Sequence, residues 1–596
     1  MFFYKNDTDN EDKVILQRII LDNHYITQAR SLYIFSKKKE EKSVLFSTDT
    51  YINIFHNTLW KDLTIVNNIK LNITCSGRGI LYLIGHQSFD EIPSSETQQQ
   101  EILASTIVES NHSQQTFCID LNNSYNYFSL SWEYNQNDNF QIIDAYYSCP
   151  HTQEHRQIRM AIVTTTYKRQ KDINTLADIY NSASHKFSEI ENSTHLFIIN
   201  NDFSDSSLQN IQNSNITVFN NPCNLGGAGG FTRGAQLAVA SETFSHILFM
   251  DDDALVHEES WLRTLSLLST LKNSYYNAPL SGAMFNREIP TFCQTMIEAL
   301  DKNFHRTLQC GEIFLESSAD VKLLLSSGHK ILVRPATAHQ QDILYPYAAW
   351  WYAVFPVAVF HQYGYPAPYF FRGDDQEFGI RIKKRPLFLN GICIWHPPFV
   401  RKRNALRQYL GLRNFLLTVA KHHKHWKRVM LHEVFVKLTC SLASKDYEYA
   451  AAILLAVADA FNYHKIPHEG EKLIPRVDNK TKNFKNNTFH LTNQQKSIPP
   501  STKQKIPLCS LIVWLTMGGV LIPAKICSPF SINSLQQLSA NILSQRVAYP
   551  GENTGRKLDC RMARTIWLKG ILSFAKILFS RRKQFLKSVN SEAFQS

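Results

Sequence analysis

The sequence lacks the cysteine spacings that mark small metal-bound or cross-linked domains. Its 11 cysteines are scattered, with no C-x-x-C pair and no regular interval, which excludes a zinc ribbon and a disulfide framework. A reducing compartment is the simpler location for such a chain. The first residues, MFFYKNDTDNEDK, also lack the basic start and apolar run of a secretory signal. Together these absences predict a cytoplasmic protein.

An apolar run long enough to cross a membrane is missing as well. The run IPLCSLIVWLTMGGVLIPAK, which starts at Ile506, is short, is broken by two adjacent glycines and is closed by Pro523. It fits a buried or interfacial element better than a spanning helix.

Acidic residues are absent from two basic stretches. Nine Lys or Arg fall between Arg401 and Arg428, and eight fall between Arg561 and Ser588, in a chain with a formal net charge of +12. Such blocks favour anionic partners, namely nucleic acid, anionic lipid or sugar phosphates. A solvated helix face explains the first block equally well.

The second basic stretch also carries large apolar residues at helical spacing. These residues are Trp567, Ile571, Phe574, Leu578 and Phe585. The pattern predicts a helix that lies on an anionic membrane surface, and a basic helix packed on the protein's own core is the alternative. No nucleic-acid-binding module accompanies the charge, so lipid phosphates are the more natural partner.

The length and the changes in pattern predict several domains. A chain of 596 residues is too long for one core and predicts about two to four domains. Up to Pro150, short β-prone runs alternate with polar turns, as in an all-β sandwich or jelly roll. After Arg401 the pattern is mainly helical, with a polar linker predicted from His468 to Lys505. The expected domains are a β-sandwich module at 1–155, an α/β domain at 156–430 and a helical region with a basic tail at 431–596.

Strands and helices alternate from Arg159 onward. The runs RMAIVTTTY, HLFIINND, ITVFNN and HILFMDDD have the composition of buried strands, and KDINTLADIYNSASHKF follows a helical pattern. This alternation predicts a mostly parallel sheet with helices on both faces. Ligands bind beyond the carboxyl ends of the strands in such sheets, so residues at the strand ends are the candidates for a site.

A glycine-rich loop precedes one of the predicted helices. The stretch NLGGAGGFTRG contains Gly226, Gly227, Gly229 and Gly230, whose backbone N–H groups could approach an anion at a helix N-terminus. The loop matches neither a P-loop nor the dinucleotide fingerprint. A flexible turn is the alternative interpretation.

Acidic residues follow the predicted strand HILFM. Since extended residues two apart face the same way, Asp251 and Asp253 can converge on one cation while Asp252 points elsewhere. Carboxylates suit Mg²⁺ or Mn²⁺, either of which would also neutralise the diphosphate of a nucleotide sugar. His396 closes another apolar strand and is a candidate third ligand, although a lone histidine at a strand end is more often structural.

Two adjacent carboxylates, Asp374 and Asp375, stand in the stretch FFRGDDQEFGIRI, just ahead of a predicted helix. Like charges side by side repel each other, and Ser or Asn would cap a helix as well without that repulsion. A carboxylate that takes a proton from a sugar hydroxyl works best when a neighbouring acid raises its pKa. Trp350 and Trp351, upstream, can be core residues or can stack on sugar rings.

These motifs resemble a known enzyme family. TTTYKR at a first strand end, DDDA, a DD-x-E turn and a late strand-end histidine resemble the family 2 glycosyltransferases of the GT-A fold. NLGGAGGFTRG, DDDA, WW and DDQEFGIR in this order resemble, more narrowly, the bacterial galactofuranosyltransferases that extend galactan chains. One departure is Gly373, where those enzymes carry a tryptophan before the paired acids. That departure bears on the acceptor side more than on the chemistry.

The resemblance implies roles for individual residues. Asp375 would be the base that deprotonates the acceptor hydroxyl, with Asp374 beside it. Asp251, Asp253 and His396 would bind Mn²⁺ or Mg²⁺ and the diphosphate, and Trp350 and Trp351 would form the floor of the acceptor site. The expected nucleotide-sugar-binding residues are Thr165, Arg169, Asn201, Asn224, Gly226, Gly227, Gly229, Gly230 and Asp252.

The function expected from the resemblance is inverting, metal-dependent transfer of galactofuranose from UDP-galactofuranose to a growing cell-surface glycan. Its partners would be a UDP-sugar donor, a glycan or lipid-linked glycan acceptor and the inner face of the plasma membrane, with a homo-oligomer left open. Two alternatives stay open as well. The chain could use another UDP- or dTDP-hexose, or it could be a catalytically dead carbohydrate-binding scaffold, against which the intact set of acids and His396 argues.

Overall fold

The computed structural model divides the chain into two compact units. The first comprises Met1–Pro222, Gly230–Pro366 and Phe378–Phe399, and the second comprises Cys223–Gly229, Ala367–Glu377 and Val400–Ser596. The structure describes residues 4–5, 12–21, 27–40, 43–87, 100–110, 113–121, 124–135, 137–204, 207–333, 345–398, 404–484, 488–490, 514–515, 527–529, 546–548, 554–557 and 559–582.

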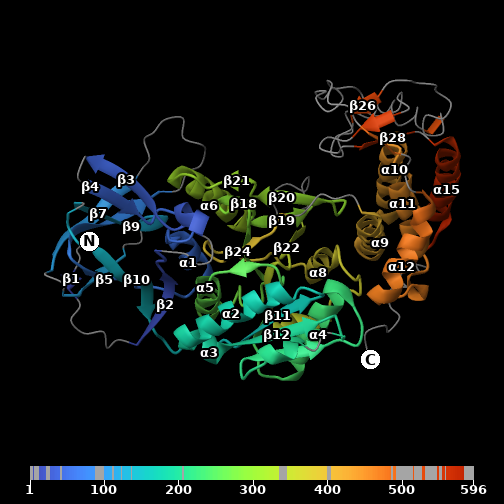
Figure 1. Ribbon diagram of the computed structural model, residues 1–596. Coiled ribbons are helices and arrows are strands. Elements are labelled where there is room, and N and C mark those ends of the chain that lie inside the picture. The colour runs from blue at the N-terminus through green and yellow to red at the C-terminus, as the bar shows by residue number, and fades with distance from the viewer. Residues whose placement is uncertain are drawn as a thin grey trace. The chain divides into compact units, whose positions relative to one another are not determined.

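The N-terminal part of the first unit contains two antiparallel five-stranded sheets (Figure 1, blue). In spatial order, the first sheet consists of β1 (Tyr4–Lys5), β8 (Gln115–Asp120), β5 (Lys70–Ser76), β10 (Gln141–Pro150) and β2 (Lys13–Arg18). The second consists of β3 (Phe35–Glu40), β4 (Ser43–Ser47), β9 (Tyr127–Asn135), β6 (Arg78–His86) and β7 (Gln100–Glu109). Buried and more exposed residues alternate along β6, as expected when one face of a sheet packs on a core.

A six-stranded mixed sheet forms the centre of the first unit. Its spatial order is β13 (Ile216–Asn220), β12 (Thr194–Asn200), β11 (Met160–Thr166), β14 (His246–Met250), β23 (Tyr352–Pro356) and β16 (Leu280–Ser281). The first four strands pair in parallel, and β23 runs antiparallel to β14. The parallel part was predicted, because its strands are continuous apolar runs separated by helical segments.

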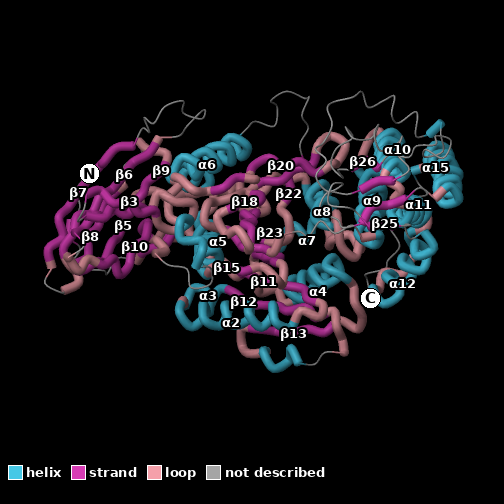
Figure 2. The backbone as a smooth tube through the Cα atoms, turned by 45° about the horizontal axis from the view of Figure 1, so that its top comes forward, coloured by secondary structure: helices cyan, strands magenta, loops and turns pink. Residues whose placement is uncertain are grey.

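Helices cover this sheet, and Figure 2 shows α2 and α4 alongside β11 to β13. The helices are α2 (Gln170–Lys186), α3 (Ser188–Ser193), α4 (Gly226–Ala240), α5 (Glu258–Thr270), α7 (Val357–Tyr363) and α8 (Asp374–Ile382). One core cluster joins Val163 and Phe249 of the sheet to Phe231 of α4 and Phe360 of α7. On the other side, Tyr180 of α2 is fully buried and stacks edge-on against a tryptophan of α5.

Two smaller sheets complete the first unit. One has the order β15 (Leu255–Val256), β24 (Cys393–His396), β17 (Ala283–Asn286), β18 (Phe292–Thr295) and β21 (Ile313–Phe314). The other has the order β20 (Arg306–Cys310), β19 (Ile297–Leu300) and β22 (Tyr345–Tyr347). The remaining helices of this unit are α1 (Asn57–Leu63) and α6 (Ser318–Val333).

A buried arginine joins the N-terminal strands to the α/β part of this unit. Arg263 of α5 is fully buried and pairs with Glu259 at 2.9 Å. Its Nη1 atom donates to the carbonyl oxygens of Ile52 (2.9 Å) and Asn390 (2.7 Å). Since a buried guanidinium is costly without partners, these bonds fix the segment around Ile52 against α5 and the turn that precedes β24.

The described part of the second unit is mainly helical (Figure 1, orange and red). Its helices are α9 (Ala405–His422), α10 (Trp426–Ala443), α11 (Tyr447–Ala460), α12 (Gly470–Thr481) and α15 (Cys560–Phe579). Short strands form a small sheet in the order β25 (Thr488–His490), β28 (Thr554–Lys557), β27 (Arg546–Ala548) and β26 (Cys527–Pro529). Among the described residues, none of the helices combines the length and the apolar character that a membrane span needs.

The predicted linker from His468 to Lys505 is wrong in its first part, which forms α12. The segment is polar, but Leu473, Val477 and Thr481 recur every four residues and are buried on one face of the helix. Most of the apolar run from Ile506 lies outside the described residues.

Candidate active site

A two-residue strand brings the acidic motif and the late histidine together. The buried strand β14 ends at Met250, and Asp251, Asp252 and Asp253 follow it directly. The chain then enters β15, where Leu255 pairs with Trp395 of β24 in antiparallel register. His396 is the next residue of β24, so this pairing places its ring beside the two aspartates although the segments are far apart in sequence.

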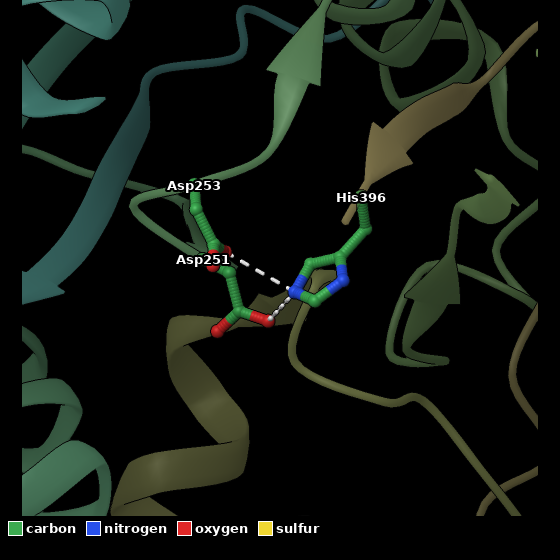
Figure 3. A group of neighbouring side chains, drawn as sticks. All are labelled: Asp251, Asp253 and His396. Atoms are coloured by element: carbon green, nitrogen blue, oxygen red, sulfur yellow. Dashed lines mark ion pairs between the residues drawn. The ribbon is translucent and has the colours of Figure 1, made fainter. Parts of the chain in front are cut away.

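The side chains of Asp251, Asp253 and His396 converge (Figure 3). The Nε2 atom of His396 lies 3.1 Å from Oδ1 of Asp253 and 3.6 Å from Oδ2 of Asp251. Asp251 keeps 35% of its side chain exposed, whereas Asp253 keeps 14% and His396 keeps 10%. The cluster is therefore open to solvent on the side of Asp251.

A backbone carbonyl orients the imidazole of His396. Its Nδ1 atom lies 2.6 Å from the carbonyl oxygen of Pro397. Because that oxygen can only accept, Nδ1 carries a proton and Nε2 is the nitrogen directed at the carboxylates. Burial lowers the pKa of His396, but the hydrogen bond to Asp253 and the charges of Asp251 and Asp253 outweigh it, so the pKa is raised.

The three aspartates differ in their proton affinity. Partial desolvation and the charges of Asp253 and Asp252 raise the pKa of Asp251 to about 7, and burial raises the pKa of Asp252 to about 6. Burial also acts to raise the pKa of Asp253, but His396 and Arg169 outweigh it and lower the pKa below its usual value. At neutral pH, Asp253 is thus the most firmly ionised of the three.

Arg169 lies directly beside this cluster. Its Nη1 atom donates to Asp252 at 2.8 Å and to Asp253 at 2.5 Å. The residue follows β11 across a turn in which Lys168 has φ of 58°, a left-handed conformation that redirects the chain. Arg169 was predicted to border the nucleotide, and its contact with the acidic motif was missed, because no sequence pattern gives the direction of an arginine side chain after a turn.

The donor set fits a divalent cation. Asp251, Asp253 and His396 each offer one ligand atom, and the three atoms lie within 4.8 Å of one another. Two carboxylates with one imidazole, partly open to water, suit Mn²⁺ or Mg²⁺. With the Nδ1 proton held by the carbonyl oxygen of Pro397, loss of the Nε2 proton leaves a neutral ring whose free nitrogen faces the two aspartates, which is the form of histidine that binds metal.

Side-chain amides connect the carboxyl ends of the neighbouring strands. Asn201, just after β12, donates from Nδ2 to the hydroxyl of Thr165 at 3.0 Å. Its Oδ1 accepts a hydrogen bond from Asn221, just after β13, also at 3.0 Å. Thr165 and Asn201 were predicted to border the nucleotide, and the structure places them together at this sheet edge. Asn221 was missed, although NN pairs follow both strands in the sequence.

The predicted glycine loop is the first turn of α4, and Gly230 is required for packing. A Cβ atom on Gly230 would lie 1.8 Å from the hydroxyl oxygen of Thr165, and one on Gly234 would lie 2.2 Å from Val163. These two glycines allow α4 to lie directly on β11.

The first glycines of α4 belong to the second unit. Gly226 has φ of 68°, and a Cβ atom there would lie 2.2 Å from the carbonyl oxygen of Phe370. A Cβ atom on Gly229 would lie 2.3 Å from Leu225, whereas no atom lies within 4 Å of a Cβ atom placed on Gly227. Asn224 is buried, and its Oδ1 accepts a hydrogen bond from the N–H of Gly226 at 2.9 Å. Of these glycines, Gly227 alone faces open space.

The paired acids are the first two residues of helix α8, which was predicted to begin just after them. Asp374 is 8% exposed, and Asp375 is partly exposed and accepts a hydrogen bond from the N–H of Gln376 at 2.8 Å. The preceding backbone is unusual, because Phe370, Arg372 and Gly373 all have φ between 72° and 78°. Left-handed non-glycine residues are costly and persist only where the surroundings hold them.

Helix α9 holds this turn in place. Asn414 is fully buried and donates to the carbonyl oxygens of Tyr369 (3.2 Å), Phe371 (3.0 Å) and Arg372 (2.7 Å). Buried Arg413 donates to Tyr369 as well, at 2.9 Å. These contacts pre-organise the segment that ends in the paired acids.

Glu377, the last acid of the DD-x-E motif, ties α8 to α9. It is fully buried and accepts hydrogen bonds from Lys421 at 3.0 Å and from His422 at 2.8 Å. A fully buried carboxylate with two such partners holds neighbouring helices together, which is the role of Glu377. Asp374 and Asp375 of the same motif are more accessible than Glu377.

Trp350 and Trp351 lie in the core of the first unit. Trp350 is 5% exposed and packs edge-on against Phe231 and Phe249. Trp351 is 8% exposed, and its indole N–H donates to the carbonyl oxygen of Gly282 at 3.0 Å. Packing accounts for both rings, and their role toward an acceptor stays a prediction.

Comparison with known proteins supports the resemblance. Residues 161–291 match the family model described as Glycosyl transferase family 2. The galactofuranosyltransferase GlfT2 of Mycolicibacterium smegmatis is 31% identical over 216 residues, which are 35% of this chain and 32% of that protein. GlfT2 of Mycobacterium tuberculosis is 30% identical over 217 residues, with the same coverage of 35% and 32%. The chain thus spans about a third of the length of the curated relatives it matches.

Solved structures show more distant similarity. The crystal structure of S. aureus TarS 1–349 is 11% identical with a TM-score of 0.31, covering 54% of this chain and 83% of that one. GalNAc-T7 with UDP, GalNAc and Mn²⁺ is also 11% identical with a TM-score of 0.31, covering 56% of each chain. The family match confirms the predicted resemblance to family 2 glycosyltransferases, and with the mixed α/β sheet it supports a GT-A domain.

Proposed function

We propose that this chain, which carries a glycosyl transferase family 2 match at residues 161–291, transfers galactofuranose from UDP-galactofuranose to a growing cell-surface glycan. The observation that carries the proposal is the convergence of Asp251, Asp253 and His396 at the carboxyl end of β14. The similarity to two galactofuranosyltransferases directs the choice of sugar.

The donor nucleotide would bind at the sheet edge beyond β11 and β12. There Thr165 and Asn201 form a hydrogen-bonded pair, and Arg169 supplies a positive charge next to the acidic motif. Asp252 is proposed as a further donor contact. Asn224 and the glycine-rich first turn of α4, with Gly226, Gly227, Gly229 and Gly230, are proposed to bind the donor as well. N–H groups in the first turn of a helix have no intrahelical partner, which suits a phosphate.

Asp251, Asp253 and His396 would hold Mn²⁺ or Mg²⁺. When bound, the ion offsets the charge that the diphosphate gains as the bond to the sugar breaks. Arg169 already neutralises part of the charge of Asp252 and Asp253, which keeps three adjacent acids compatible with the folded state.

Asp375 would act as the general base and Asp374 as its acidic neighbour. In the proposed reaction, Asp375 takes the proton of an acceptor hydroxyl while that oxygen forms a bond to the anomeric carbon and the diphosphate leaves from the opposite side. Attack from the side opposite the leaving group inverts the configuration. The turn held by Asn414 fixes the base, which favours an orientation ready for reaction. Trp350 and Trp351 are proposed to support the acceptor side from below the surface.

Helix α15 is proposed to bind an anionic membrane surface at the inner face of the plasma membrane. Its outer face exposes Leu568, Ile571, Leu572, Leu578 and Phe579. The exposed cations on the same helix are Arg561, Arg564, Lys569 and Lys576. An apolar stripe flanked by cations is typical of an interfacial helix.

The exposed stripe differs in part from the predicted one. Trp567 donates its indole N–H to the carbonyl oxygen of residue 514 at 2.8 Å, and Phe574 packs against Phe435 of α10, so both face the protein. Ile571 and Leu578 are exposed, and Phe585 lies outside the described residues. The helix therefore combines both interpretations of the sequence, with one face packed and the other exposed.

A panel of nucleotide sugars tests the proposal. Purified protein with Mn²⁺ should release nucleoside diphosphate from UDP-galactofuranose far faster than from UDP-galactopyranose, UDP-glucose or a dTDP-hexose. Equal or faster turnover of a pyranose donor would move the assignment to another hexose. No turnover of any donor, with the fold intact, would favour a carbohydrate-binding scaffold.

A further inference from the structure

A second, basic cleft lies in the first unit, away from the acidic cluster. It has a volume of about 560 Å³ and is lined by edge strand β2, helices α3 and α5, and the segment 156–159 that leads into β11. This volume falls within the range of roughly 300–1,000 Å³ that small-molecule pockets occupy. None of the motifs in the proposed transfer reaction contributes to it.

Four cations and one acid line this cleft. Arg18 pairs with the acid, Glu189, at 2.8 Å. The other cations are Lys13, Arg156 and Arg159. Arg159 is exposed, and no hydrogen bond or ion pair within the described part of the chain holds its guanidinium. The cleft thus carries a surplus of positive charge.

Two of the guanidinium groups are held in fixed positions. Arg18 lies over the ring of Phe187 at 4.9 Å, in addition to its pair with Glu189. Arg156 lies over the ring of Tyr276 at 4.5 Å and donates to the carbonyl oxygen of Leu271 at 2.5 Å. Cations that are already ordered lose little conformational entropy on binding an anion.

The rest of the lining suits a saccharide better than a bare anion. Apolar side chains of α5, including Leu262 and Leu265, stand with Ile158 in the floor. Polar groups such as Gln157 and Asn192 are placed among the cations. Sugar rings present C–H faces and hydroxyl edges together, so this mixture matches an oligosaccharide.

The cleft lies at the opposite end of the parallel sheet from the acidic cluster. Arg159 directly precedes β11, whereas Arg169, which contacts Asp252 and Asp253, follows its other end. The 7 residues of β11, at about 3.3 Å each, separate the two ends by roughly 20 Å. A ligand in the cleft would therefore leave the donor side free.

We infer that this cleft binds an anionic segment of a glycan, carrying carboxylate or phosphate groups. The choice of a glycan rests on the proposed function, whereas the preference for an anion rests on the cleft itself. A chain held here stays attached to the enzyme while its end is elongated elsewhere.

Binding of a fluorescent oligogalacturonate hexamer to the full chain tests this inference. Arg159→Gln removes an exposed cation and should weaken binding by about tenfold, as expected when a charged hydrogen bond is lost. Adding Lys13→Gln should weaken it further. The matched control is Arg78→Gln, since Arg78 is 70% exposed in another part of the same unit. Its affinity should stay within about twofold of the unmodified chain.

Several outcomes would overturn the inference. These are unchanged binding by Arg159→Gln, an equal loss in Arg78→Gln, equal binding of a neutral maltohexaose, and displacement of the hexamer by inorganic phosphate at the same concentration. Transfer assays test the proposed function independently of the cleft. Arg159→Gln should transfer sugar to a short neutral acceptor at the rate of the unmodified chain. If the unmodified chain showed no transfer but the expected binding pattern was found, the inference that the cleft binds an anionic segment would be supported and the transferase assignment would fail.

Discussion

Gly230 lies so close to Thr165 that a Cβ atom on the glycine would be 1.8 Å from the threonine hydroxyl oxygen. The same hydroxyl accepts the hydrogen bond from Asn201. Helix α4 thus packs on β11 near the carboxyl end of the strand, beside the residues of the candidate site.

Gly230→Ala should lower the free energy of unfolding by about 1–3 kcal/mol, because the added methyl group forces α4 away from β11. Thermal or denaturant unfolding measures the effect. Gly227→Ala is the matched control: that position has open space, and alanine favours a helix over glycine, so stability should be kept or raised. Equal destabilisation by both substitutions would contradict the packing role of Gly230.

Asp375→Asn should remove turnover while leaving donor binding nearly intact, because a general base acts in the transition state and not in the ground state. Single-turnover rates and the donor Kd, measured side by side, separate the two effects. Asp374→Asn should reduce the rate less. A normal rate for Asp375→Asn with a lost rate for Asp374→Asn would reverse the assignment.

Mn²⁺ affinity should fall as the pH is lowered from 8 to 6. The pKa of Asp251 is raised to about 7 and that of His396 is also raised, so the metal-free site takes up protons over this range. Bound metal must displace them, and each displaced proton weakens affinity by up to about tenfold per pH unit. Calorimetric titration with Mn²⁺ gives the affinity directly. His396→Ala should bind more weakly at pH 8, and a pH-independent affinity would refute the assigned ligands.

Asn414→Ala should destabilise the turn before the paired acids. The change leaves carbonyl oxygens of Tyr369, Phe371 and Arg372 without this donor, at a cost of about 1–3 kcal/mol. Faster amide hydrogen exchange at residues 370–376, together with a lower kcat, is the expected result. Unchanged exchange there would show that Arg413 and the rest of α9 suffice to hold the turn.

Leu568→Asp with Leu572→Asp should reduce binding to vesicles that contain anionic lipid, since both leucines are more than half exposed on α15. The fold should persist, because the buried residues of the helix, such as Ile566 and Ile577, are untouched. Co-sedimentation with anionic and with neutral vesicles measures the change. Unaltered binding of the double variant would remove α15 as the membrane-binding element.

Much of the α/β domain followed from the sequence, because buried parallel strands leave continuous apolar runs and their ends leave conspicuous acids. The same reasoning joined Asp251, Asp253 and His396, which the structure brings together. It could not give the contact of Arg169 with the acids, which depends on the left-handed turn at Lys168. Nor could it separate Gly230, needed for packing, from Gly227, which faces open space, because all the glycines look alike in the sequence.

Other elements escaped prediction because their patterns are weak. The run SVLFSTDTYINIF is β-prone throughout, but β4 ends at Ser47 and the chain turns before Ile52 and Ile54, which are buried by tertiary contacts. Helix α12 has few apolar residues, and Pro475 lies inside it. In each case packing against distant segments decides the local structure, and a single sequence shows only the local preference.

The pairing of β15 with β24 has a consequence for how the protein is made. The candidate ligands on either side of it, Asp253 and His396, are 143 residues apart in the sequence, and closing so long a loop is slow compared with forming local structure. A chain that leaves the ribosome has Asp251 and Asp253 well before His396 is available to join them. The three candidate ligands therefore come together only in chains whose central sheets have closed, so binding of a divalent cation to them would report on the completion of folding.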